Sequence, residues 1–128
     1  MSLTGTVSIR DFSVAAVIGV HPWEREIEQT LLVSVDMAAD VRKAAASDDL
    51  ADALDYSAVV AAIAAVLREG RFRLIETAAE RVAERLLTDF GLNWLRLELR
   101  KPIAGAPTPD AMPIYIAVIT IERGNEIP

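Results

Sequence analysis

Cysteine is absent from the 128-residue sequence, and histidine occurs once, at His21. The lack of cysteine excludes disulfides, thiolate nucleophiles and cysteine-ligated zinc or iron–sulfur sites. A single histidine cannot supply a pair of imidazole metal ligands, and no Gly-x-Ser-x-Gly motif accompanies it. We therefore interpret His21 as a loop histidine without a catalytic task, and we predict no metal site.

Long apolar runs and clusters of basic residues are also missing. No stretch reaches the roughly 18 uncharged apolar residues of a membrane helix, and the N-terminal MSLTGTVSIRDF lacks the basic start and apolar run of a signal peptide. The net charge is −6 with no local basic cluster, so the phosphate backbone of a nucleic acid would be repelled. We expect a soluble cytoplasmic protein without membrane or nucleic-acid partners.

Aromatic residues make up only 5% of a sequence that is 52% apolar. The core is therefore expected to be aliphatic and rich in alanine. A chain of this length forms one domain, which we place at residues 1–128. The apolar fraction is high for so small a domain, which suggests that part of the apolar surface is buried between subunits.

Alternating apolar residues predict strands on both sides of a helical region. In the first strand, the buried parity changes near Arg10 and Asp11, which predicts a β-bulge because one extra residue exchanges the two faces. The predicted strands span residues 4–20, 30–41, 93–101 and 113–123.

Two helices are predicted between the second and third strands. The first is expected to begin at an N-cap, Ser57, and to end at Gly70. The second carries an apolar stripe from Ile75 to Phe90 and ends at Gly91. The order strand–strand–helix–helix–strand–strand predicts an α+β fold, in which a four-stranded antiparallel sheet carries both helices on one face.

The edges of such a sheet suggest self-assembly. The last strand is uncharged from Met112 to Thr120, so its edge has little protection against pairing with another chain. Several subunits that close into one continuous barrel would remove these edges. We therefore expect a homo-oligomer.

Four residues with ordinary side chains lie at informative positions. Glu76 is at the expected start of the second helix, where free N–H groups and the helix dipole favour an anion, although it could serve only to complement that dipole. Glu24 is more simply explained as a solvated turn carboxylate, Tyr56 as an aromatic residue at the edge of the core, and Lys101 as a solvated lysine at a strand end. Considered one residue at a time, these simpler explanations are favoured.

Taken together, several segments resemble the dihydroneopterin aldolases of folate biosynthesis in order and spacing. They cover most of residues 4–123 and are IGVHPWEREIEQTLLVSVDM (18–37), SDDLADALDYSAVV (47–60), GRFRLIETAAERVAERLL (70–87) and LRLELRKP (95–102). The resemblance implies the tunnelling fold, in which the sheets of four subunits join into a β-barrel ring. It also implies a tetramer, or an octamer of two stacked rings, with active sites at the subunit interfaces.

The resemblance further implies roles for individual residues. Glu76 matches the family's pterin anchor, and the backbone around Leu54 and Ile75 would complete the ring pocket. The residues that match the catalytic groups are Lys101 for the lysine that shuttles protons, Glu24 for the carboxylate that positions the relay, and Tyr56, beside the ring, for the tyrosine implicated in protonating the enamine.

The activity implied is the retro-aldol cleavage of 7,8-dihydroneopterin, with no cofactor, because the pterin imine can take up the electrons. Epimerisation at C2′ is a plausible side activity. Two alternatives remain: a dihydroneopterin triphosphate 2′-epimerase, for which Arg71, Arg73 and Arg100 are the candidate phosphate ligands, and a non-catalytic pterin-binding subunit. The loop after Lys101 and the arginine at position 73 depart from the pattern of the family.

Overall fold

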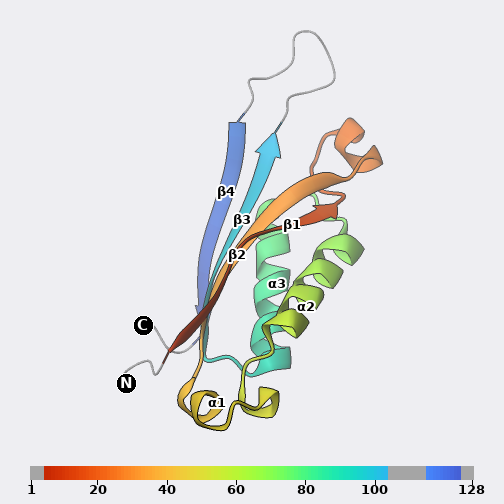
Figure 1. The fold of residues 1–128 in the computed structure, drawn as a ribbon. Coiled ribbons are helices and arrows are strands. Elements are labelled where there is room, and N and C mark those ends of the chain that lie inside the picture. Colours follow the sequence, from red (N-terminus) through yellow and green to blue (C-terminus); the bar gives the residue numbers. More distant parts are fainter. Residues whose placement is uncertain (1–4, 104–114, 125–128) are drawn as a thin grey trace.

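The protein is described by a computed structural model covering residues 5–103 and 115–124. Its four strands form one antiparallel sheet in the order β1-β2-β3-β4, and the two long helices, α2 and α3, lie on one face of this sheet (Figure 1). The elements are β1 (Thr6–Ala16), η1 (Pro22–Glu26), β2 (Gln29–Ala38), α1 (Arg42–Ser47), η2 (Leu50–Asp52), α2 (Tyr56–Gly70), α3 (Ile75–Phe90), β3 (Trp94–Ile103) and β4 (Tyr115–Gly124). The predicted α+β architecture is confirmed for a single chain.

The predicted bulge is present in β1. Ile9 pairs with Val35 and Phe12 with Val33, so Arg10 and Asp11 together lie opposite one residue of β2 and the register shifts by one. Asp11 adopts a φ of +50° there, and its N–H donates to the Ser34 hydroxyl at 3.0 Å. The bulge returns the apolar side chains of β1 to the helical side of the sheet.

The core lies between the sheet and the helical pair. One face of β2 and one face of β3 are fully buried, as the alternation predicted, and they meet the apolar stripes of α2 and α3. The buried residues of these four elements include Leu31, Val33, Val35, Met37, Val59, Ile63, Leu67, Ala79, Val82, Ala83, Leu86, Leu95, Leu97 and Leu99. This core fixes the position of α3 relative to β3.

Two predicted helix boundaries are wrong. The N-cap of α2 is Asp55, whose carboxylate accepts the N–H three residues later, so Ser57 already lies inside the helix. At the other end Gly70 is helical and Arg71 takes the left-handed conformation, with φ +45°. The ring of Phe72 explains why Gly70 is a glycine, because a Cβ there would lie 2.1 Å from a ring carbon. The predicted end of α3 at Gly91 is confirmed, with φ +59°.

The second strand is shorter than predicted. It ends at Ala38 rather than at residue 41, and the short helix α1 follows, which the periodicity did not indicate. Most of the loop expected after Lys101 lies outside the described residues. Within the described ranges, no helix is both long and apolar enough to cross a membrane.

Different connecting segments lie at the two ends of the sheet and the helical pair. At one end, η1 lies beside the end of α2 and the start of α3; at the opposite end are α1 and the start of α2 (Figure 1). Most of the predicted site residues fall at the first end.

Candidate active site

A pocket of about 240 Å³ lies at the end of the sheet that carries η1. Its walls come from the β1–β2 connection, the start of α3, and the neighbouring strands β3 and β4. Four predicted site residues line it, namely Glu24, Ile75, Glu76 and Lys101. The remaining wall is largely apolar, with Val20, Trp23, Leu74, Tyr115 and Ala117. A flat ring with a polar edge would find both kinds of contact here.

Glu24 and Lys101 form a buried ion pair in this pocket, although 77 residues separate them in sequence. Their side chains are only 3% and 9% exposed. Burial on its own raises the pKa of the Glu24 carboxyl. Hydrogen bonds from Lys101, Gln29 and the His21 N–H, together with the Lys101 charge, outweigh that effect and hold this pKa below its ordinary value. The carboxylate is therefore ionised at neutral pH.

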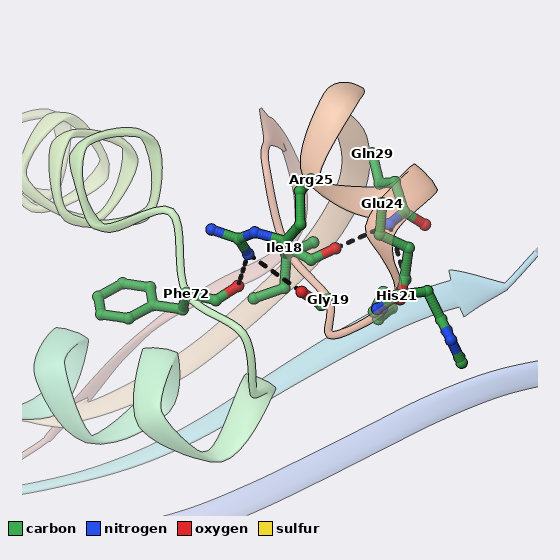
Figure 2. A network of polar contacts seen from close by, with 8 residues as sticks. Ile18, Gly19, His21, Glu24, Arg25, Gln29 and Phe72 are labelled. Atoms are coloured by element: carbon green, nitrogen blue, oxygen red, sulfur yellow. Dashed lines mark hydrogen bonds and ion pairs between the residues drawn. The ribbon is translucent and has the colours of Figure 1, made fainter.

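The β1–β2 connection is shaped around the Glu24 carboxylate. Gly19 adopts a φ of +129°, and a Cβ at this position would lie 2.2 Å from the Glu24 carboxyl carbon. Gln29 donates to Glu24 Oε2 at 3.0 Å and to the Ile18 carbonyl at 2.8 Å, so one amide joins the carboxylate to the chain just after β1 (Figure 2). The His21 N–H donates to the other carboxylate oxygen at 3.1 Å. Both oxygens of Glu24 thus have fixed partners.

Glu76 is in the first turn of α3, as predicted, and its side chain is exposed. The N-cap of α3 is Leu74, which offers no side-chain hydrogen bond to the helix start. An anion near these N–H groups is favoured by the helix dipole, by typically 0.3–1 kcal/mol. Glu76 therefore presents an available carboxylate to the same pocket as the buried ion pair.

Leu54 and Tyr56 do not line this pocket. Tyr56 begins α2, whose 15 residues separate it from the α2–α3 connection by about 20 Å at 1.5 Å per residue. Its side chain is 60% exposed, so it is not the core-edge aromatic residue that we considered as a simpler explanation. Within one chain, these two residues lie at the opposite end of the helical pair from Glu76.

Residue-by-residue interpretation underestimated this site. Glu24 and Lys101 are not solvated. Both are buried in the pocket wall, where each one neutralises the charge of the other. Gln29, the first residue of β2, was not singled out. The His21 ring also lines the pocket and stacks on Trp23, with ring centroids 6.2 Å apart. Only the tertiary structure brings these residues together.

The three arginines considered as phosphate ligands lie in different places. Arg73 lines the pocket, whereas Arg71 contacts the backbone of η1 and Arg100 lies near Glu98 and Asp11 on the sheet face away from the helices. Among the described residues, no group of three or more metal-ligating side chains is present. The predicted absence of a cofactor stays a prediction.

The chemistry of the pocket follows from these groups. An exposed carboxylate can accept two parallel N–H donors from one edge of a heterocycle. A lysine whose partner carboxylate is fixed by three donors can hold a water molecule or move a proton near a bound ring. The pocket therefore suits acid–base chemistry on a flat, nitrogen-rich ligand.

Comparisons with known proteins point to one enzyme family. The family model for dihydroneopterin aldolase (FolB) matches residues 7–117. The dihydroneopterin aldolase of Escherichia coli is 44% identical over 121 residues, covering 94% of each chain. That of Streptomyces coelicolor is 36% identical over 119 residues, covering 93% of this chain and 97% of the relative.

A solved structure extends the similarity to three dimensions. The E. coli dihydroneopterin aldolase in complex with neopterin superimposes with a TM-score of 0.83 at 42% identity, covering 94% of this chain and 99% of that one. The match includes nearly the whole chain, so the pocket and its walls lie inside the matched region. This chain belongs to the dihydroneopterin aldolase family.

Proposed function

We propose that this chain cleaves 7,8-dihydroneopterin by a retro-aldol reaction, giving 6-hydroxymethyl-7,8-dihydropterin and glycolaldehyde. Relatives that carry the name of this activity match almost its full length. At the level of residues, one observation carries the proposal: a helix-start carboxylate, Glu76, shares a pocket with the buried Glu24–Lys101 pair.

Glu76 binds the pyrimidine edge of the substrate. A pterin presents its 2-amino group and N3–H side by side, and one ionised carboxylate accepts both in a fork. The free N–H groups at the start of α3 favour a negatively charged side chain at this position. The Ile75 backbone adds polar contacts at the ring edge, and the apolar wall packs on the ring faces.

The substrate supplies the electron sink of the reaction. Loss of the proton from the 2′-hydroxyl breaks the C1′–C2′ bond and releases glycolaldehyde. The electron pair moves into the C6=N5 imine, which becomes an enamine as N5 is protonated. Protonation of C1′, with loss of the N5 proton, then restores the C6=N5 imine and gives the hydroxymethyl product. The mechanism calls for neither a Schiff base nor a metal, and re-formation of the bond on the other face would give the C2′ epimer.

Lys101 and Glu24 handle the protons of this sequence. Lys101 holds a water molecule near N5 and passes protons, while Glu24 fixes the position of the lysine through their ion pair. Because two further donors, the His21 N–H and the Gln29 amide, also hold the Glu24 carboxylate, the ammonium group has a defined location relative to the pocket. General acid–base groups of this kind contribute about 10²–10⁴-fold each.

Tyr56 and Leu54 complete the site from a second copy of the chain. Both lie at the opposite end of α2 from the pocket of their own chain, and Tyr56 is exposed where a neighbour could receive it. The edge strand β4 also exposes Tyr115, Ile116 and Val118, which supports pairing with a neighbouring sheet. We infer a barrel-shaped ring of four subunits, alone or stacked as an octamer, with sites between subunits.

The activity is tested by product analysis. Purified protein incubated with 7,8-dihydroneopterin should release glycolaldehyde and 6-hydroxymethyl-7,8-dihydropterin in equal amounts, measured by chromatography after derivatisation. Preference for the substrate triphosphate, with epimer as the product, would instead identify an epimerase. Tight neopterin binding without any turnover would identify a non-catalytic pterin-binding subunit.

Substitution of Glu76 tests the anchor. Glu76→Gln should lower neopterin affinity by at least 100-fold, because the amide sets an N–H donor against a donor of the ring. Glu84→Gln, an exposed glutamate later on the same helix, is the matched control and should bind normally. Equal neopterin affinity of the two variants would show that Glu76 does not bind the pterin. Titration calorimetry measures both.

Subunit mixing tests the shared site. Lys101→Ala and Tyr56→Ala should each be inactive, but co-assembled after unfolding and refolding they should regain turnover, because some interfaces would then hold both native residues. A mixture that stays as inactive as its components would place both residues in the same copy and contradict the interfacial site. Light scattering on the native protein should give a mass of four or eight times 13.9 kDa.

A further inference from the structure

We propose that Arg25 is a positioning residue that sets the placement of the η1 wall, with Glu24, relative to the anchor Glu76. The inference rests on the proposed roles of those two carboxylates. Arg25 does not line the pocket and does not touch the proposed substrate position. Its guanidinium instead joins the two chain segments from which the acid–base group and the anchor extend.

The contacts of Arg25 go to backbone carbonyls of both segments. Nη1 donates to the Gly19 carbonyl at 3.0 Å and to the Phe72 carbonyl at 3.1 Å (Figure 2). Nη2 donates to the Arg71 carbonyl at 2.6 Å, and the Arg71 side chain returns a bond to the Arg25 carbonyl at 3.4 Å. Figure 2 shows the guanidinium between the Gly19 turn and the Phe72 segment. A single half-buried side chain therefore bridges two connections that lie 46–47 residues apart.

Each bridged segment adjoins one of the two proposed functional carboxylates, Glu24 or Glu76. Glu24 is the residue before Arg25, and Gly19 makes room for its carboxylate. Phe72 lies four residues before Glu76 on the connection that leads into α3. Among the residues that the structure describes, the only backbone hydrogen bond between these connections runs from the Gly19 N–H to the Phe72 carbonyl, at 3.1 Å.

The η1 turn needs such a bridge more than the other walls of the pocket. Lys101 and Glu76 extend from β3 and α3, which pack against each other through the buried core. In η1, by contrast, only Glu24 is buried, so its apolar packing is slight. A planar guanidinium that donates in fixed directions to three carbonyls supplies the geometry that packing does not. A shift of about 1 Å at a reacting group can cost about 100-fold in rate.

Removal of Arg25 should separate turnover from binding. In Arg25→Ala, Glu24 keeps its bonds from Lys101, Gln29 and His21, and Glu76 keeps its place on α3. The Glu24 contacts and the Glu76 anchor both remain, but the distance between them is no longer fixed by the Arg25 bridge. We expect kcat to fall about 100-fold while neopterin affinity changes by less than threefold.

The test compares Arg25→Ala with Arg85→Ala, which removes an exposed arginine that pairs with Asp89 one turn further along α3. Both are assayed for kcat, KM and neopterin affinity, with and without millimolar guanidinium chloride. Guanidinium should restore part of kcat in Arg25→Ala and leave wild type and Arg85→Ala unchanged. If Arg25→Ala does not fold, Arg25→Lys, whose ammonium group can still donate to a carbonyl but lacks the planar fork, should show the same split at smaller size.

Two results would overturn the proposal while the wild type remains active. An unchanged kcat in Arg25→Ala would show that the bridge does not position the reacting groups. A parallel fall in kcat and affinity, without rescue by guanidinium, would show a merely structural role. If the wild type releases no glycolaldehyde, the proposed function itself fails, and this inference fails with it. The activity of the wild type, measured in the same assay, therefore distinguishes the two failures.

Discussion

The two faces of the sheet each carry an ion pair, and the two pairs differ in their exposure to solvent. On the helical side, the pocket contains one ion pair, Glu24–Lys101, whose side chains are 3% and 9% exposed. On the other face, Arg10 and Asp36 form a pair at 2.6 Å whose side chains are 59% and 23% exposed. Both pairs join residues distant in sequence, but only the first is removed from water.

This difference in exposure indicates which of the two ion pairs has a functional role. Exposed ion pairs contribute about 0–1 kcal/mol, because solvent screens them and the side chains lose freedom. A buried pair is often no more stabilising than apolar residues of the same size, since desolvation offsets the attraction. A buried lysine that is fixed by a carboxylate in a pocket wall is therefore better explained by function than by stability.

The largest effect is expected when the buried pair is broken. Lys101→Met leaves the Glu24 charge buried without its main partner, which should lower the free energy of unfolding by about 3–5 kcal/mol. Turnover should fall by about 10²–10⁴-fold, because the proton-transferring group is gone. Urea denaturation and glycolaldehyde release measure the two quantities.

The double variant Glu24→Gln/Lys101→Met serves as its control, since it removes both charges at similar volume. It should recover most of the lost stability and none of the activity. Full activity in either variant would contradict the mechanism.

A smaller effect is expected from pH. The folded-state pKa of Glu24 is lowered, so its ionisation stabilises the folded protein above the unfolded-state pKa of about 4.3, and this contribution is lost as pH falls through the folded-state pKa. The difference in unfolding free energy between wild type and Glu24→Gln should be constant at neutral pH and shrink below about pH 4. A difference that instead grows on acidification would mean that the folded-state pKa of Glu24 is raised and not lowered.

The smallest effect is expected at the exposed pair. Arg10→Ala should change the free energy of unfolding by less than about 1 kcal/mol, because Ser8 still donates to Asp36 and solvent replaces the arginine. Turnover should equal that of wild type. A loss as large as that of Lys101→Met would show that exposure does not separate the two pairs.

Local pattern was sufficient to predict the main elements. The alternation of Leu95, Leu97 and Leu99 identified β3, because a half-buried strand must place every second side chain in the core. The parity change near Arg10 identified the bulge for the same reason. The start of α3 placed Glu76 correctly, because helix termini favour charges whatever the fold around them.

Boundaries were harder, because neighbouring residues compete for the same role. Ser57 and Asp55 are both good N-caps, and the choice of Asp55 depends on where the chain enters the helix. Gly70 has the residue type of a helix end, but the ring of Phe72 packs against it and the left-handed turn moves to Arg71. The short helix α1 has too few residues to show a period.

Sequence alone determined the layers of this protein and the helix-start carboxylate, because period and terminus effects act within a few residues. The environment of Glu24 and Lys101 was decided only by the tertiary structure. Nothing next to either residue in the chain marks it as buried, and each becomes a stable interior charge only when a segment 77 residues away supplies its partner. The bridge made by Arg25 has the same origin, because its carbonyl acceptors are available only where the Gly19 and Phe72 connections meet.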